Sequence, residues 1–182
     1  MLVALALIGG IVLLIAGGDD SNDDSGSTPT RATTNLQEKF LKRTVVNAED
    51  GISVRRPGHW SDAKNNGVIT LRSADRCVAV NLSAPPGAPG LRSLRRDALA
   101  TLRQGFKKVR VGPGGRAKVG GIPTRSSTIV LTADKGKRRR VLLSIGKGER
   151  HTYLTEVVLG NPSCQADLAL AQVVLGSIEY TK

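Results

Sequence analysis

Short stretches in which apolar and polar residues alternate recur along most of the chain, and this pattern is typical of half-buried β-strands. The clearest example runs over residues 51–60, where Ile52 and Val54 alternate with polar residues. A Pro-Gly pair ends the alternation, and the only tryptophan, Trp60, follows directly. The pattern predicts that this strand is the first element of the folded domain and that Trp60 lies in the core of that domain.

Further segments rich in Val, Ile, Leu and Thr predict additional strands. They lie at residues 68–71, 77–82, 108–111, 117–119, 124–132, 140–145 and 152–159. Glycine-rich sequences separate several of them, and we interpret VGPGG and GGIP as turns and DKGKRRR as the tip of a long β-hairpin. Strands joined in sequence by short turns predict a mostly antiparallel, meandering sheet.

Three other segments have helical spacing. Leucines recur every three or four residues over residues 91–105 after a Pro-Gly pair, which predicts an amphipathic helix. Residues 166–178 are apolar on nearly every side, so we expect a helix buried between the sheet and a second element. The shorter sequence LQEKFLKR, residues 36–43, predicts one or two helical turns that lead into the domain.

The beginning of the chain differs in composition from the rest. Residues 1–18 are apolar and uncharged, and a helix of about 17 to 25 such residues spans a bilayer core, so we expect a transmembrane anchor. A cleaved signal peptide is the alternative, and the missing basic segment leaves open a true start upstream. Residues 19–47 read as a polar, disordered linker with a short helix, and residues 48–182 as one domain.

The order of these elements resembles that of the PsbP-like superfamily. The resemblance spans roughly residues 49–180, and its carriers are Gly-Ile-Ser-Val with the following Pro-Gly-His-Trp, the helix after the Pro-rich loop, the Gly-Gly-Ile-Pro turn and the closing Gly-Ser-Ile. It implies an α+β fold, an α/β/α sandwich in which helices flank a mostly antiparallel sheet. Known members include a photosystem II subunit, a nuclear protein that binds a small GTPase, and many bacterial envelope proteins. The resemblance therefore implies a binding or assembly domain, not an enzyme.

The chain is strongly basic, with a formal net charge of +12, and two groups of basic residues stand out. The hairpin tip holds Lys135, Lys137, Arg138, Arg139 and Arg140. A stripe on the polar side of the 91–105 helix holds Arg92, Arg96, Arg103 and Lys107. We expect one of these groups to contact anionic lipid or wall polymer near the membrane. The alternative is that both are solvated surface charges, which protect an exposed hairpin and keep the domain soluble.

Cysteine and histidine are the residues with the most distinctive chemistry in this chain. In an exported protein, Cys77 and Cys164 predict a disulfide, and two buried free thiols are the alternative. His59, His151 and the two cysteines form no close-spaced His/Cys/Asp cluster of the kind that a zinc site requires.

No sequence motif indicates catalysis. Residues 112–117 match the G-x-G-x-x-A form of a dinucleotide-binding loop, but no helix follows to hold the phosphates. Ser126 and Ser127 lie outside any nucleophile-elbow sequence, and few aromatic residues are present to stack on nucleic acid bases.

The sequence therefore predicts a non-enzymatic module of a bacterial cell envelope, without cofactor, metal or nucleic acid. A single-pass anchor would hold its domain on the extracytoplasmic side of the cell membrane, since no basic residue directly follows the apolar segment. Its partner would be an envelope protein of unknown identity. The alternative is a basic domain that binds anionic lipid or cell-wall polymer.

Overall fold

The computed structural model describes residues 40–133, 136–160 and 165–180. The predicted membrane anchor at residues 1–18 lies outside these residues, as does most of the predicted linker. Within the described ranges, no helix is long and apolar enough to cross a membrane.

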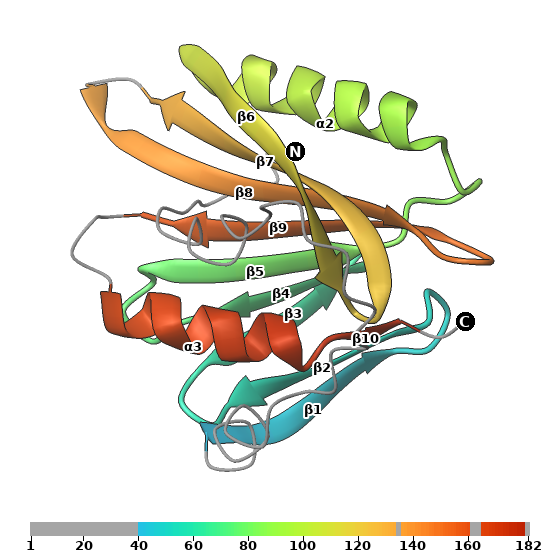
Figure 1. Ribbon diagram of the computed structural model, residues 1–182. Coiled ribbons are helices and arrows are strands. Elements are labelled where there is room, and N and C mark those ends of the chain that lie inside the picture. Colours follow the sequence, from blue (N-terminus) through green and yellow to red (C-terminus); the bar gives the residue numbers. More distant parts are fainter. Residues whose placement is uncertain (1–39, 134–135, 161–164, 181–182) are drawn as a thin grey trace, which may run out of the picture.

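Two antiparallel sheets and two helices build the described part of the chain (Figure 1). The larger sheet has seven strands in the order β3-β4-β5-β9-β8-β7-β6. These are β3 (Ser61–Asn65), β4 (Val68–Arg72), β5 (Val78–Ser83), β6 (Lys108–Val119), β7 (Ile122–Thr132), β8 (Arg138–Lys147) and β9 (Thr152–Leu159). The smaller sheet has the order β1-β2-β10 and consists of β1 (Leu41–Asn47), β2 (Ile52–Pro57) and β10 (Glu179–Tyr180). The predicted mostly antiparallel α+β fold is confirmed.

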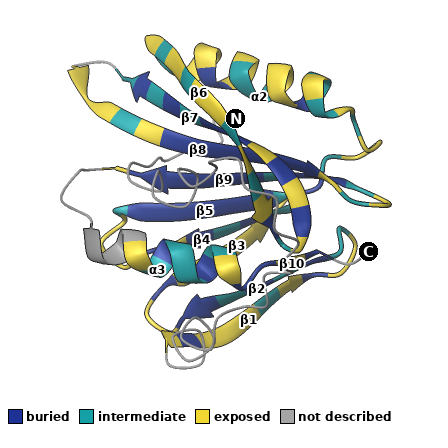
Figure 2. Ribbon diagram, viewed as in Figure 1, coloured by how far each residue is buried: buried dark blue, intermediate teal, exposed yellow. Residues whose placement is uncertain are grey.

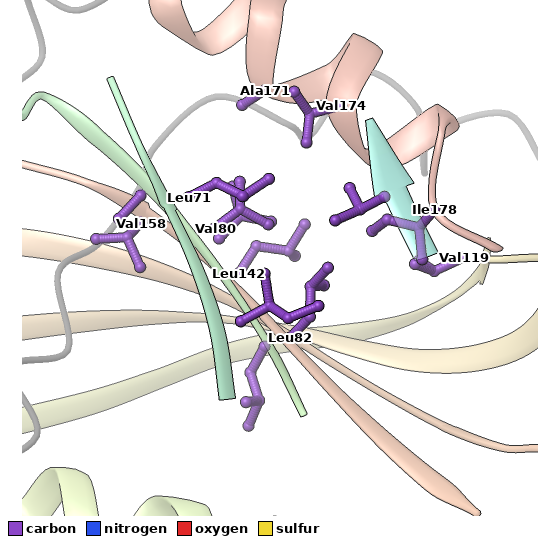
Figure 3. Packing of buried hydrophobic residues seen from close by; sticks show 14 of the residues in the cluster. Leu71, Val80, Leu82, Val119, Leu142, Val158, Ala171, Val174 and Ile178 are labelled. Carbon is purple, nitrogen blue, oxygen red and sulfur yellow. The ribbon is translucent and has the colours of Figure 1, made fainter. Parts of the chain in front are cut away.

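The two helices cover opposite faces of the larger sheet. Helix α2 (Leu91–Gly105) packs against β6 and β8, and Arg95 of this helix donates a hydrogen bond to Ser127 on β7. Helix α3 (Gln165–Gly176) packs between β5 and β2, so it lies between the two sheets. In Figure 3, Ala171 and Val174 of α3 point toward the large sheet. We call the two sides of the large sheet the α2 face and the α3 face.

The central strands are buried on both of these faces. Strands β5, β8 and β9 are nearly continuous runs of buried residues, which Figure 2 shows in dark blue. Strand β3, at the edge, is polar and fully exposed. Both faces of the central strands contact a core. Their sequences are therefore apolar runs in which polar residues alternate little.

The first strand corrects one prediction from the sequence. A short helix was expected over residues 36–43. Residues 36–39 lie outside the described residues and Phe40 is helical, but strand β1 already begins at Leu41 and pairs with β2 along its length. Leu41 is fully buried, and the β-branched residues of Thr-Val-Val favour an extended backbone. The folded region therefore includes β1, within the segment expected to be linker.

Strand β6 corrects a second prediction. VGPGG does not turn the chain; it lies within one continuous strand, and the pairing with β7 shifts register between Val111 and Gly114. A side chain at Gly112 would meet the Thr128 carbonyl oxygen at 3.1 Å, and Pro113 needs no partner for a backbone N–H. The glycines here allow a β-bulge at the sheet edge.

Tyr180 of β10 connects the small sheet to the large one. Its hydroxyl lies 2.7 Å from the Thr155 hydroxyl, and its ring stacks on Tyr153 with a centroid separation of 3.9 Å. The ring also meets the β6–β7 turn, where a Cβ on Gly120 would lie 2.2 Å from the Tyr180 ring. The turn sequence is therefore fixed by packing as well as by backbone conformation.

We expect Gly120→Ala to lower the free energy of unfolding by at least about 1 kcal/mol more than Gly121→Ala, because it adds a clash to the strain of a left-handed residue. Both glycines have positive φ, 58° and 80°, but a Cβ on Gly121 would have no atom within 4 Å. Urea denaturation of the two variants checks this prediction. Equal losses would mean that Tyr180 moves aside at little cost.

Candidate functional site

Strand register separates the basic residues of the predicted hairpin tip. Arg138 pairs with Thr132 and Arg140 with Val130, so both side chains point to the α3 face. Arg139 points to the α2 face and is half-buried. Lys137 is exposed in the turn, and Lys135 lies outside the described residues.

Two further basic residues, which the sequence did not single out, join the α3 face from strand β6. Lys108 pairs with Thr132 and Arg110 with Val130, each on the opposite side of β7 from Arg138 and Arg140. We call Lys108, Arg110, Arg138 and Arg140 the cationic strand face. Strand geometry places its members about 7 Å apart along a strand and about 10 Å apart across β7.

The cationic strand face is open, and no acid of the described residues compensates its charge. All four side chains are exposed, and Figure 2 shows the hairpin end of β8 in yellow. Among the described residues, the ion pairs are Arg56–Asp62 and Arg96–Asp97. No described carboxylate therefore lies within 4.0 Å of a basic group of the four residues. The patch therefore presents concentrated positive charge on an open sheet surface.

The predicted basic stripe lies on the other side of the molecule. Arg92, Arg96 and Arg103 are exposed on α2, and Lys107 is exposed just after its end. Arg96 approaches Asp97 at 3.3 Å, but both side chains are more than half exposed, so this pair stabilises little. Because α2 covers the opposite face of the sheet, the stripe and the cationic strand face cannot contact one flat surface together.

The cysteines and histidines stay apart in the part of the chain that the structure describes. Cys77 is half-buried directly before β5, and no free cysteine lies in this part. Cys164 lies outside it, so the Cys77–Cys164 disulfide stays a prediction. His59 is exposed in the β2–β3 turn, whereas His151 precedes β9 and contacts the Tyr153 ring. Within the described ranges, no three His, Cys, Asp or Glu residues group as metal ligands would.

A buried carboxyl group lies on the α2 face. Glu156, in the middle of β9, is only 8% exposed. Asn81 on β5 donates a hydrogen bond to Glu156 Oε2 at 3.4 Å, and the Thr70 hydroxyl on β4 donates to Asn81 Oδ1 at 3.0 Å. Burial raises the pKa of Glu156 to about 7, while the Asn81 hydrogen bond acts in the opposite direction.

A cavity of about 200 Å³ adjoins this carboxyl group between α2 and the sheet. Ala98 and Thr101 of α2 form one wall, and Val68 and Leu154 form part of the other. The only sequence signal for the site is the single acid in the apolar strand sequence TYLTEVVL. Period-two alternation places that acid on the same face as Leu154, but the cavity itself depends on where α2 lies.

The raised pKa of Glu156 predicts a pH-dependent stability. The ordinary pKa of 4.5 applies in the unfolded chain, so between about pH 4.5 and 7 the folded state binds more protons. The free energy of unfolding should therefore fall by up to roughly 3 kcal/mol as pH rises through this window. Above about pH 7, Glu156 should cause no further loss.

Replacing the carboxyl by an amide should remove this loss. We expect Glu156→Gln to be more stable than the unsubstituted chain at pH 8 and to differ little from it at pH 4.5, as measured by urea denaturation at both pH values. Glu179→Gln, at an exposed acid on β10, is the matched control and should leave the free energy of unfolding unchanged at both pH values. A constant difference at the two pH values would contradict the assignment.

Comparison with known proteins identifies the fold. No protein-family model and no curated protein matches the sequence. Among solved structures, the cyanobacterial PsbP protein CyanoP from Synechocystis sp. PCC 6803 aligns with a TM-score of 0.55 at 16% identity, covering 76% of this chain and 92% of CyanoP.

A protein from Bacteroides thetaiotaomicron VPI-5482, with a crystal structure at 1.50 Å resolution, aligns with a TM-score of 0.56 at 13% identity. The alignment covers 79% of this chain and 50% of that protein, so the chain spans half the length of the Bacteroides protein. At such identities the likeness concerns the fold alone. The fold of this chain is PsbP-like.

Proposed function

We propose that this chain is a non-enzymatic binding or assembly module of a bacterial cell envelope, anchored in the membrane with its domain on the extracytoplasmic side. Its partner would be an envelope protein with an acidic surface, bound on the cationic strand face. The observation that carries the proposal is the grouping of Lys108, Arg110, Arg138 and Arg140 on one open sheet surface without an acidic partner among the described residues.

Electrostatics supports an acidic partner. Four exposed cations on one sheet surface repel one another. A complementary acidic surface relieves that repulsion and steers association. Val130 and Thr132, half-buried between the four cations, offer a small apolar centre. A centre of this kind inside a polar rim is the usual anatomy of a protein interface.

Anionic lipid or wall polymer is the second candidate ligand. The observation in its favour is that Arg138 and Arg140 lie at the end of a hairpin, where exposed Lys137 extends the basic surface. Each basic residue near an anionic membrane contributes about 1 kcal/mol, and salt screens this attraction. Binding that is lost at high salt and that accepts many anions would favour this candidate.

The remaining parts of the proposal rest on the sequence. The absence of catalytic motifs supports a non-enzymatic role, and the apolar residues 1–18 support the anchor. Export also supports the disulfide between Cys77 and Cys164. An Ellman assay of the unfolded, unreduced protein should detect no thiol, and two free thiols would contradict the disulfide without affecting the binding proposal.

Cross-linking in the native membrane tests the binding proposal. The test variant carries Lys108→Glu, Arg110→Glu, Arg138→Glu and Arg140→Glu. The control variant carries Arg92→Glu, Arg96→Glu, Arg103→Glu and Lys107→Glu, which changes the net charge equally on the other side of the molecule. Each anchored protein is cross-linked, purified at high salt and analysed by mass spectrometry for the protein attached to it.

We expect one partner protein to be recovered with the unsubstituted chain and the control, and its yield to fall by more than about tenfold with the test variant. Equal losses in both variants would contradict the proposed surface, because net charge alone would then control binding. Co-sedimentation with vesicles of phosphatidylglycerol and phosphatidylcholine, at low and high salt, tests the alternative that the surface binds anionic lipid. Vesicle binding without a protein partner would replace the first candidate by the second.

A further inference from the structure

We propose that the cavity beneath α2 binds a small aliphatic amine, whose ammonium group is held by Glu156. The site lies on the α2 face, opposite the cationic strand face, and it does not depend on the function proposed for that surface.

The size and walls of the cavity fit a short alkyl chain. Its volume of about 200 Å³ corresponds to roughly six water molecules. Val68 and Leu154 on the sheet and Ala98 on α2 supply apolar contacts, and the polar groups of the lining belong to Asn81, Ser83, Thr101 and Glu156. A ligand with an apolar body and one polar head can use both kinds of contact.

The carboxyl group of Glu156 has an unused acceptor. Asn81 donates to its Oε2, whereas its Oε1 has no hydrogen-bond partner among the described residues. The Ser83 hydroxyl lines the same cavity and lies on the same face of β5 as Asn81. An ammonium group has three N–H donors and no acceptor, so it can donate to Glu156 and to Ser83 together.

The charge of the site also favours an amine. No basic side chain of the described residues lies within 4.0 Å of Glu156, so its negative charge is buried without a counter-charge. Burying an unpaired carboxylate is costly, which is why the pKa of Glu156 is raised. An ammonium ion supplies the missing positive charge, whereas a carboxylate ligand would face a like charge.

A role in packing alone does not account for an acid at this position. Leu154 and Val158, the neighbours of Glu156 on the same face of β9, are both apolar, and an apolar residue between them would avoid the burial of a charge. Asn81 and Thr70 instead continue a polar row across β5 and β4 toward Glu156. This row orients the carboxyl group beside the cavity.

Titration of the full chain in mild detergent with n-butylamine at pH 8 tests the proposal. NMR signals of the Ala98 and Leu154 methyl groups report occupancy, and n-butanol and butyrate of the same chain length serve as probes of charge. We expect saturable shifts with n-butylamine, an affinity about 10- to 100-fold lower for n-butanol, and no saturation with butyrate.

Two variants separate the head-group contact from the cavity. Glu156→Gln should lower n-butylamine affinity about 10- to 100-fold, to the level of n-butanol, whereas Glu179→Gln at an exposed acid should leave it unchanged. Ala98→Leu keeps the carboxyl group but fills the cavity, so it should abolish the shifts with both probes. The proposal is overturned by unchanged amine affinity in Glu156→Gln, by saturable butyrate binding, or by no saturable shift with n-butylamine.

Discussion

Replacing Trp60 by alanine is expected to lower the free energy of unfolding by about 3 to 5 kcal/mol. The indole ring is 1% exposed and is among the largest side chains in the core. Trp60 lies between β2 of the small sheet and β3 of the large sheet, where the chain passes from one to the other. Its removal would leave a cavity at the junction of the two sheets, and their relative position would prevent neighbouring residues from filling it.

Urea denaturation measures this loss, and the melting temperature should fall by roughly 10 to 20 °C. Trp60→Phe is the control, because it keeps most of the ring volume and removes an indole N–H that has no hydrogen-bond partner among the described residues. It should therefore lose much less stability than Trp60→Ala. If the alanine variant lost under about 1 kcal/mol, Trp60 would not belong to the core.

Local periodicity explains which elements of this fold could be predicted from the sequence. Helix α2 begins and ends where its leucine spacing and flanking Pro-Gly indicate, at Leu91 and Gly105. Strands β2 and β9 are also found as expected, since alternation and apolar content are properties of a few neighbouring residues. The turn at residues 120–123 was predicted for the same reason, and its φ values confirm the need for glycine.

Elements that depend on distant partners were missed. Strand β3 is fully exposed, with four polar residues out of five, and becomes a strand because β4 pairs with it; β10 is only two residues long. The division into two sheets has no local signal, because β10 joins β2 from the far end of the chain. VGPGG has the composition of a turn, and only its pairing with β7 shows that it is a bulge.

The same distinction applies to the candidate sites. The basic residues of the hairpin tip are close together in sequence, but the hairpin directs Arg139 to one face and Arg138 with Arg140 to the other. Lys108 and Arg110 join the latter pair only through β7. Likewise, Glu156 meets Asn81 across a strand pair that is 75 residues apart in sequence. Register and helix placement, which no single segment determines, create both sites.

Arg56 provides the second prediction with a large expected effect. Its side chain is 5% exposed, forms an ion pair with Asp62, and donates to the carbonyl oxygens of Pro57 and Trp60. These contacts hold the turn after β2 and so fix the position of Trp60. We expect Arg56→Met, which keeps the aliphatic stem, to lower the free energy of unfolding by about 3 to 5 kcal/mol, since buried acceptors and a carboxylate lose their partner.

Arg55 offers a matched control for Arg56, because it is the neighbouring arginine and its side chain donates a single hydrogen bond among the described residues, to the Leu41 carbonyl oxygen at 3.1 Å. Arg55→Met should cost about 1 kcal/mol in urea denaturation, and equal losses for the two variants would contradict the role given to Arg56. Asp62→Ala should cost less than Arg56→Met, because Arg56 keeps its carbonyl partners and the Asp62 side chain is 35% exposed. The double variant should lose less than the sum of the single losses, by about 0.5 to 3 kcal/mol, since the second substitution removes a charge already left without its partner.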